Sequence, residues 1–254
     1  MGNFLVAKNI SMKFGGLMAV DGVDMEIKEG EIHGLIGPNG AGKTTFFNVL
    51  SGVYISTGGK VEFLGRDITK KTAHEIAKMG VTRTFQNILL FNGMTVLENI
   101  MVGFHSRCGS NIVNTILHTP YMKREEKRCY EKAREVVAFM GLESDEQTIV
   151  NGMPYGKKRL VEIARALASE PKILMLDEPC AGMNPTETES LIEVVYRVRK
   201  LGITILLVEH NMRVAMGISD IVTVLDHGRK ICEGLPDMVK NDERVIEAYL
   251  GKEE

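Results

Sequence analysis

The sequence predicts an α/β protein in which one sheet-based core is interrupted by a helical insertion. Three observations lead to this prediction. Strand patterns come first, helical patterns dominate residues 95–167, and strands then alternate with helices. A glycine-rich motif lies between a strand and a helix at residues 37–44. Several apolar strands end at a polar residue of a type that takes part in catalysis or metal binding. One interrupted domain over residues 1–254 fits this order better than two independent domains.

The composition indicates a globular protein without a general affinity for polyanions. The chain has 254 residues, 44% of them apolar, which is enough for a full core. Its 31 Lys and Arg against 33 Asp and Glu give a formal charge of -2, so we expect no nucleic-acid partner. The four cysteines show no metal-binding spacing, and no signal peptide or membrane-spanning run is evident. We therefore expect thiols and a cytoplasmic location.

The first eighty residues predict strands that flank a glycine-rich turn. Residues 23–27 alternate between apolar and charged side chains, the period of a half-solvated strand. The segment 31–37 is a short apolar strand, and 44–50 continues as a helix. Residues 60–63 form another strand, and a short helix ends at Gly80.

The middle of the chain is mostly helical. Thr95 and Glu98 fit a capping box, and a long charged helix over 124–140 ends at Gly141. Residues 106–121 lack a clear period, so we expect a loop with a short helix there.

A further helix begins with an unusual concentration of positive charge. Its apolar face starts at Leu160, yet Lys157, Lys158 and Arg159 stand at the end where the helix dipole is already positive. The simplest interpretation is that something anionic docks there. Alternatively, Lys158 and Arg159 are solvated or hold the helix to its neighbours.

After Pro171 the chain returns to alternating strands and helices. An apolar strand covers 172–176, a helix covers 187–200, and a second apolar strand covers 203–209. Two short strands then surround a turn at residues 227–228. This order predicts that the last third of the chain completes the sheet begun near the N-terminus.

The motif GPNGAGKT, residues 37–44, predicts a phosphate-binding loop. It matches Gly-x-x-x-x-Gly-Lys-[Ser/Thr] and lies between a strand and a helix, the context that this motif requires. Its glycines allow backbone N–H groups to surround a polyphosphate, and the helix dipole adds to them. We expect Lys43 to reach the β- and γ-phosphates and the Thr44 hydroxyl to bind Mg²⁺.

Polar residues follow three other strands. In ILMLDEP, Asp177 is placed to approach the metal, and Glu178 to face the γ-phosphate and activate water. Taken alone, two carboxylates after an apolar strand are also typical of a strand with a solvated acidic end. Together with the phosphate-binding loop, they predict nucleotide hydrolysis. His210 and Gln86 also follow strands, where ligands gather in α/β sheets, although lone residues of these types are more often polar loop residues.

Together these motifs resemble an ATP-binding-cassette (ABC) ATPase, from about Phe4 to the C-terminus. The resemblance implies a P-loop NTPase fold with an antiparallel β subdomain and an inserted α-helical subdomain at about 87–168. It further implies that Gln86 senses Mg²⁺ and the attacking water, that Glu178 is the general base and that His210 holds the γ-phosphate. The implied metal ligands are Thr44, Gln86 and Asp177. The implied ATP-binding residues are Phe14, against adenine, with Val20, Gly37, Pro38, Asn39, Gly40, Ala41, Gly42, Lys43, Thr44 and Thr45.

ABC ATPases work as head-to-tail dimers, and here the signature that closes the partner's site is degenerate. The family sequence Leu-Ser-Gly-Gly-Gln aligns with residues 153–157, where only Gly156 is kept. One interpretation is that Gly156 N–H, the helix dipole and nearby cations act in trans; the other is an impaired signature that needs a different subunit opposite. The implied trans residues are Pro154, Tyr155, Gly156, Lys157 and Asn184.

The segments PYGKKRLVEIARAL, DEPCAGMNP, LLVEHNM, MGISD and VIEAYLG resemble the ATPase subunits of branched-chain amino acid importers. That resemblance implies a homo- or heterodimer of ATPases, two transmembrane permeases, an indirect solute-binding protein and a peripheral place on the cytoplasmic membrane face. Residues 87–99 are candidates for a permease groove, or they pack the subdomains together. Urea or amide uptake, lipid export and soluble iron–sulfur assembly remain alternatives.

Overall fold

The computed structural model describes residues 4–104 and 120–250. The chain divides into two compact units. The first contains residues 1–83, 172–180 and 195–254, and the second contains residues 84–171 and 181–194. The prediction of a loop with a short helix over 106–121 lies outside the described residues, except that residues 120–121 begin a long helix.

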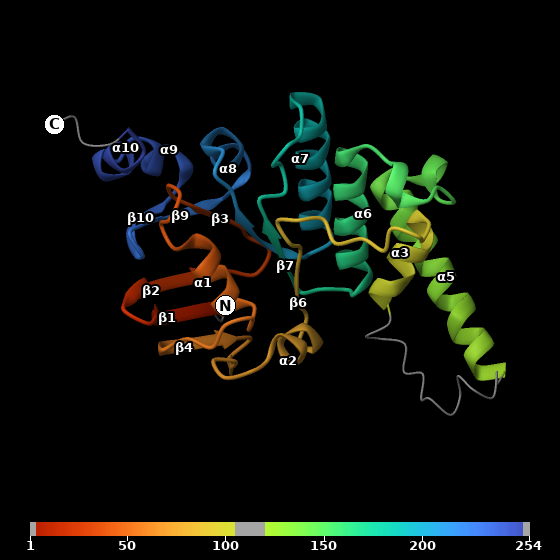
Figure 1. Cartoon of the computed structure of the whole chain (residues 1–254), viewed down its shortest axis with the longest axis horizontal. Helices are drawn as coiled ribbons and strands as arrows, with labels where there is room; N and C mark the ends of the chain where they lie inside the picture. The colour runs from red at the N-terminus through yellow and green to blue at the C-terminus, as the bar shows by residue number, and fades with distance from the viewer. Residues whose placement is uncertain (1–3, 105–119, 251–254) are drawn as a thin grey trace. The chain divides into compact units, whose positions relative to one another are not determined.

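The first unit holds two sheets. A four-stranded sheet has the order β2-β1-β4-β5, with antiparallel neighbours, as the red and orange strands of Figure 1 illustrate. A six-stranded sheet has the order β10-β9-β3-β8-β7-β6 and is parallel except for β10. The strands are β1 (Leu5–Phe14), β2 (Leu17–Ile27), β3 (Ile32–Ile36), β4 (Gly58–Phe63), β5 (Arg66–Asp67), β6 (Val81–Arg83), β7 (Ile173–Asp177), β8 (Thr204–Val208), β9 (Ile221–Asp226) and β10 (Arg229–Gly234).

The central strands are apolar because both faces of the parallel sheet are covered. Every residue of β3, β7 and β8 is buried. Phe46 and Phe47 of helix α1 are also fully buried, in a core that includes residues of both sheets. The helices of this unit are α1 (Lys43–Leu50), α2 (Ala73–Lys78), α8 (Met212–Ile218), α9 (Pro236–Lys240) and α10 (Glu243–Leu250).

The second unit is helical. Helices α3, α5 and α6 pack against one another, as Figure 1 shows in yellow and green. The predicted capping box of α3 is confirmed, because Thr95 N–H donates to the Glu98 carboxylate at 2.8 Å and Glu98 N–H donates to the Thr95 hydroxyl at 3.2 Å. The helices are α3 (Val96–Gly103), α5 (Pro120–Met140) and α6 (Tyr155–Ala168), with short 3₁₀ turns at Glu143–Asp145 and Val150–Gly152. Helix α7 (Pro185–Lys200) begins in this unit and ends in the first.

The structure bears on two expectations from the sequence, one about the cysteines and one about membrane-spanning segments. Cys129 is disulfide-bonded, so the expectation of thiols is wrong at this position, because distance along the chain does not limit proximity in space. Cys180 and Cys232 carry thiols as expected. Within residues 4–104 and 120–250, no helix is long and apolar enough to span a membrane.

Candidate nucleotide site

The loop between β3 and α1 follows a path that only glycine permits at two positions. Gly37 has φ 151°, and a Cβ there would lie 2.1 Å from the Leu225 carbonyl oxygen. Gly42 has φ 94°, and its Cβ would lie 2.4 Å from the Ala19 carbonyl oxygen. Any larger residue would push the loop away from its neighbours. The glycines therefore allow the loop backbone to pack tightly against these neighbours. The N–H groups of the loop are the ones that the sequence predicts to surround a polyphosphate.

Lys43 is held inside this loop. Its Nζ donates hydrogen bonds to the carbonyl oxygens of Gly37 at 2.6 Å and Pro38 at 2.9 Å, and the side chain is buried. Burial lowers the pKa of Lys43, while the charges of Glu178 and Asp177 act in the opposite direction. The first turn of α1 contains no acidic residue. The positive end of the helix and the Lys43 ammonium thus act together on any anion at the loop.

Asp177, the last residue of β7, is paired with a cation that the sequence reading missed. Arg83, at the end of β6, approaches Asp177 Oδ2 at 3.2 Å through Nη2. Nη1 of Arg83 donates to Asn48 Oδ1 at 2.6 Å and to Ser51 Oγ at 2.9 Å, both on or next to α1. Burial lowers the pKa of Arg83, and Asp177 opposes that shift. No motif points to Arg83, because its role depends on the pairing of β6 with β7.

Glu178 and His210 lie at neighbouring strand ends. The parallel pairing of β7 and β8 brings Asp177 opposite Val208, so the residues that follow are adjacent. Glu178 Oε2 is 3.7 Å from His210 Nδ1. Glu178 has φ 45°, a left-handed conformation that is uncommon outside glycine. Its N–H donates to the Val208 carbonyl oxygen at 2.9 Å, which fixes the residue at the sheet edge.

Phe14 has an aromatic partner that the sequence reading also missed. Its ring lies 5.4 Å from that of Tyr54, edge to face at 77°. Both rings are partly exposed, so one or both can accept a planar ligand. Tyr54 follows α1, and only the tertiary fold brings it to the end of β1. Val20, another predicted ATP contact, is fully buried, and its neighbour Ala19 is the residue whose carbonyl faces Gly42.

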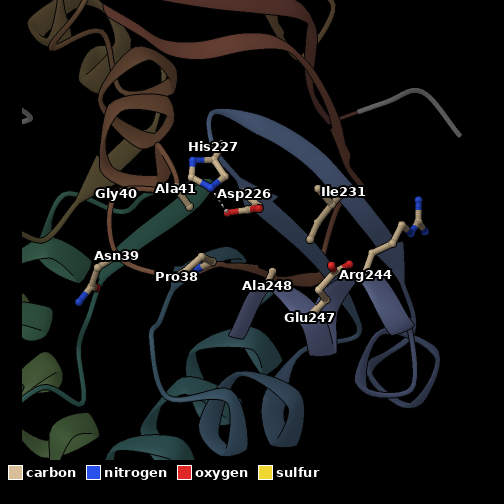
Figure 2. A pocket seen from close by; sticks show the side chains of 10 residues that line it. All are labelled: Pro38, Asn39, Gly40, Ala41, Asp226, His227, Ile231, Arg244, Glu247 and Ala248. Atoms are coloured by element: carbon tan, nitrogen blue, oxygen red, sulfur yellow. Dashed lines mark ion pairs between the residues drawn. The ribbon is translucent and has the colours of Figure 1, made fainter. Parts of the chain in front are cut away.

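A pocket of about 780 Å³ is lined in part by the glycine-rich loop. Figure 2 shows loop residues 38–41 on one side and the C-terminal segment on the other, with the Asp226–His227 ion pair at 3.8 Å between them. Ile231, Arg244, Glu247 and Ala248 come from the C-terminal segment. The last part of the chain therefore contributes one wall of a cavity at the loop.

In the second unit, each of the three cations at the start of α6 has an intramolecular partner. Lys157 Nζ lies 2.6 Å from Asp145 Oδ2, and Lys158 Nζ donates to the Asn151 carbonyl oxygen at 2.7 Å. Arg159 is fully buried, so it is neither solvated nor open to an anion. The alternative that Arg159 holds the helix to its neighbours is the one that the structure supports.

Arg159 binds the segment that contains Gln86. Its Nη1 donates to the Phe85 carbonyl oxygen at 2.8 Å and to Glu162 Oε2 at 2.6 Å, while Nη2 donates to the Gln86 carbonyl oxygen at 2.9 Å. Glu162 Oε1 accepts the Phe85 N–H at 3.4 Å, and the Arg159 side chain also reaches the Tyr155 hydroxyl at 3.2 Å. Burial raises the pKa of Glu162, and Arg159 opposes the shift. This pair ties the backbone at Gln86 to the first turns of α6.

The predicted trans residues gather in the second unit. A Cβ on Gly156 would lie 2.6 Å from Glu187 Oε1, and a Cβ on Gly182 would lie 3.5 Å from the Tyr155 ring. Asn184 caps α7 by accepting the Glu187 N–H at 2.9 Å. Pro154 is the N-cap of α6 and, like Tyr155 and Lys157, is exposed, whereas Gly156 is buried. The start of α6 and the start of α7 therefore form one continuous patch.

Comparisons with known proteins agree with this chemistry. Residues 20–181 match the ABC transporter family, and residues 229–254 match the family described as branched-chain amino acid ATP-binding cassette transporter. The high-affinity branched-chain amino acid transport ATP-binding protein LivG of Salmonella typhimurium is 42% identical over 249 residues, 98% of each chain. The corresponding protein BraF of Pseudomonas aeruginosa is 40% identical, also over 98% of each chain.

A solved structure gives the same result for the fold. The ADP conformation of MJ1267, an ATP-binding cassette of an ABC transporter, superimposes with a TM-score of 0.86 at 32% identity, over 99% of this chain and 100% of that one. The predicted fold class is thereby confirmed. The residue roles assigned above from the resemblance remain predictions. Because the family match spans more than half of the chain and the relatives match almost all of it, the chain belongs to the ABC transporter family, as one of its ATP-hydrolysing ATP-binding cassettes.

Proposed function

We propose that this protein powers an importer of branched-chain or other hydrophobic amino acids by hydrolysing ATP on the cytoplasmic face of the membrane. The observation that carries the hydrolytic part is the pairing of Glu178 with His210 at adjoining strand ends, 3.7 Å apart, in the same unit as the Lys43 loop. The transported solute is inferred from the names of the relatives, because no residue of an ATPase subunit needs to touch it. The match of residues 229–254 to a branched-chain amino acid family supports the same solute class.

The residues present suit a magnesium nucleotide. Two glycines of the loop pack against the backbone at Leu225 and Ala19, where a Cβ would clash, and a glycine-rich turn before a helix is the kind of backbone that binds polyphosphates. Asp177 and Thr44 offer the carboxylate and hydroxyl oxygens that Mg²⁺ prefers, and Gln86 is the third expected ligand. When bound, Mg²⁺ would offset the negative charge of the phosphates. Lys43 would contact the β- and γ-phosphates, Glu178 would accept a proton from the attacking water, and His210 would hold the γ-phosphate.

The patch at the start of α6 and α7 supports a role in closing a second nucleotide site. The proposed trans contacts are Pro154, Tyr155, Gly156, Lys157 and Asn184, opposite a second ATPase subunit that is either the same chain or a similar one. Pro154 is the N-cap of α6 and makes no side-chain capping bond, and the first N–H groups of a helix have no partner within the helix, so those of α6 are available to an anion. The Tyr155 side chain, 43% exposed, stands where the family consensus has its first glycine.

An apolar surface after Gln86 is the proposed docking place for one of two transmembrane permeases. Leu89, Phe91 and Met94 are 56%, 48% and 37% exposed, and apolar side chains of this kind suit a partner helix. Asn99 holds this segment by accepting the Phe91 N–H at 2.9 Å and donating to the Phe91 carbonyl oxygen at 3.2 Å. A solute-binding protein would act on the same importer without contacting this chain.

Replacing Lys43 with alanine is expected to weaken ATP binding by at least tenfold. The substitution removes a charged donor to the phosphates, and hydrogen bonds to charged groups contribute about 1.5–3 kcal/mol each. Titration with a fluorescent ATP analogue measures the change. Lys28→Ala, an exposed lysine on the same unit, is the control and should bind normally. Equal affinity of the Lys43 and Lys28 variants would remove Lys43 from the phosphate site.

Replacing Phe14 with alanine is expected to weaken ATP binding by about ten- to a hundredfold, because stacking of a base on an aromatic ring contributes about 1–3 kcal/mol. Tyr54→Ala should have a smaller effect in the same direction, since Tyr54 supports the Phe14 ring edge-on. The measurement is the dissociation constant of ATP against that of inorganic triphosphate, whose binding should not change. Leu201→Ala, also exposed, serves as control. An equal loss for ATP and triphosphate would contradict base stacking.

Partner recovery tests the proposed function as a whole. The Glu178→Gln protein is tagged, loaded with Mg-ATP and recovered from detergent-solubilised membranes of its source cells. Two amino-acid-type permeases and a second ATPase subunit are expected by mass spectrometry, and a Leu89→Ser/Phe91→Ser variant should lose the permeases while retaining ATP. Recovery of urea, amide or lipid-export permeases would assign another solute. Recovery of soluble partners only, such as iron–sulfur assembly proteins, would overturn the importer proposal.

A further inference from the structure

Glu209 is a buried carboxyl group to which the proposed function gives no role. It follows β8, directly before His210, and its side chain is fully buried. Oε1 accepts the Cys180 N–H at 3.1 Å. Oε2 is buried and has no hydrogen-bond partner among the described residues. A buried acid with an unsatisfied oxygen is costly, which calls for an explanation of its presence so close to the site.

The contact of Glu209 with Cys180 completes the attachment of the loop that carries Glu178. The Glu178 N–H donates to the Val208 carbonyl oxygen at 2.9 Å, and the Cys180 N–H donates to Glu209 Oε1. Pro179 lies between them and has no N–H. Residues 178–180 therefore have two backbone N–H groups, and both donate to residues at the end of β8, one to Val208 and the other to Glu209. Glu209 is itself fixed, because its N–H donates to the Leu35 carbonyl oxygen at 3.3 Å at the end of β3.

The loop needs such support. Glu178 adopts φ 45°, and a non-glycine residue in this region persists only when its surroundings hold it there. The pairing of β7 with β8 ends at Asp177 and Val208, and the Glu178 N–H bond to the Val208 carbonyl oxygen is the last hydrogen bond of this ladder. Beyond that point, the hydrogen bond from the Cys180 N–H to Glu209 Oε1 continues the link between the two strand ends.

We propose that Glu209 is a positioning residue for ATP hydrolysis. By accepting the Cys180 N–H it holds the loop of Glu178 against the end of β8 and keeps Glu178 and His210 aligned across the two strand ends. This inference rests on the proposed function, in which Glu178 and His210 act on the γ-phosphate and its water. Glu209 itself does not touch the nucleotide, because its side chain is fully buried.

The protonation state of Glu209 determines which substitutions can replace it. Burial raises its pKa, while the hydrogen bond from the Cys180 N–H and the charge of His210 act in the opposite direction. A neutral carboxyl still accepts the Cys180 N–H through Oε1. Glutamine has nearly the same shape and the same acceptor, so it should replace Glu209. Leucine fills the volume of the side chain but cannot accept the Cys180 N–H. Alanine neither fills the volume nor accepts this hydrogen bond.

Steady-state ATPase kinetics of Glu209→Gln, Glu209→Leu and Glu209→Ala test the proposal. Glu209→Gln is expected to keep kcat within threefold. The Leu and Ala variants should lower kcat by roughly 10- to 100-fold, as expected for a small misplacement of catalytic groups, with little change in KM or in ATP affinity. The Leu variant keeps the core filled and remains informative if the Ala variant does not fold. Glu31→Ala removes a buried carboxylate next to the start of β3, away from the site, and should leave kcat unchanged.

Two results would overturn the proposal. One is a Leu variant with normal kcat; the other is a Gln variant as impaired as the Leu variant, because a simple acceptor would then be insufficient. Glu178→Gln is assayed in parallel to separate this inference from the proposed function. A slow Glu178→Gln protein beside a normal Glu209→Leu protein refutes only the positioning role. A wild-type protein without ATPase activity, or an unimpaired Glu178→Gln protein, would refute the proposed hydrolytic assignment itself.

Discussion

Replacing Glu178 with glutamine is expected to lower ATP turnover by about 10²- to 10⁴-fold, the range expected for loss of a general base. Glutamine fits the same space and can keep the N–H contact with Val208, so the left-handed conformation at φ 45° should survive. It cannot accept a proton from water. Binding of ATP should therefore stay close to normal while hydrolysis nearly stops.

The measurement combines phosphate release under saturating Mg-ATP with equilibrium binding of a fluorescent ATP analogue. Glu26→Gln is the matched control, since Glu26 is exposed on β2 and should leave both quantities unchanged. Near-normal phosphate release by the Glu178→Gln protein would show that another group activates the water. Lost binding together with lost turnover would instead indicate that Glu178 is needed to hold the loop.

Replacing Arg159 with methionine is expected to lower the free energy of unfolding by about 3–5 kcal/mol, the range found when one partner of a buried ion pair is removed. The substitution leaves Glu162 buried without its cation and removes the donors to the Phe85 and Gln86 carbonyl oxygens. Since burial already raises the pKa of Glu162 and Arg159 opposes that shift, the pKa of Glu162 should rise further in the variant.

Urea denaturation of the variant and of Lys157→Met measures this difference. Lys157 lies two residues earlier on α6 and pairs with Asp145, but its side chain is 46% exposed. Its replacement should change stability by only about 0–1 kcal/mol, as for other exposed pairs. A combined Arg159→Met/Glu162→Leu variant should recover part of the loss because the Glu162 carboxylate is no longer buried without Arg159. An Arg159 variant as stable as the Lys157 variant would refute the structural role of this cation.

Much of the fold could be predicted because the signals were local. The alternation in residues 23–27 and the apolar run before Gly37 correspond to β2 and β3. The Thr95–Glu98 pair marks the start of α3, where both reciprocal hydrogen bonds form. The short helices α8 and α9 escaped prediction. Helices of five to seven residues depend on packing against the sheet, so their own sequence carries little signal.

The residues of the candidate site also divide into those that a local motif predicts and those that only the tertiary structure identifies. The phosphate loop, Asp177 with Glu178, and His210 were visible because each couples a residue type to the end of a strand. Arg83, Tyr54 and Glu209 were not visible, because their partners lie tens of residues away and no local motif marks them. The sequence marks Arg159 as a charge but not as a buried one, since three consecutive cations give no indication of which one faces the interior.

The sequence by itself determined the family, the phosphate loop and the strand-end carboxylates, because these depend on residue type and spacing within a few residues. Only the tertiary structure decided how the charges are used. Strand pairing sets Arg83 against Asp177 and Glu209 against Cys180, and helix packing buries Arg159 beneath the Gln86 backbone. Ion pairs and hydrogen bonds act over a few ångströms, so their partners are fixed by the order of strands and helices in space and not by distance along the chain.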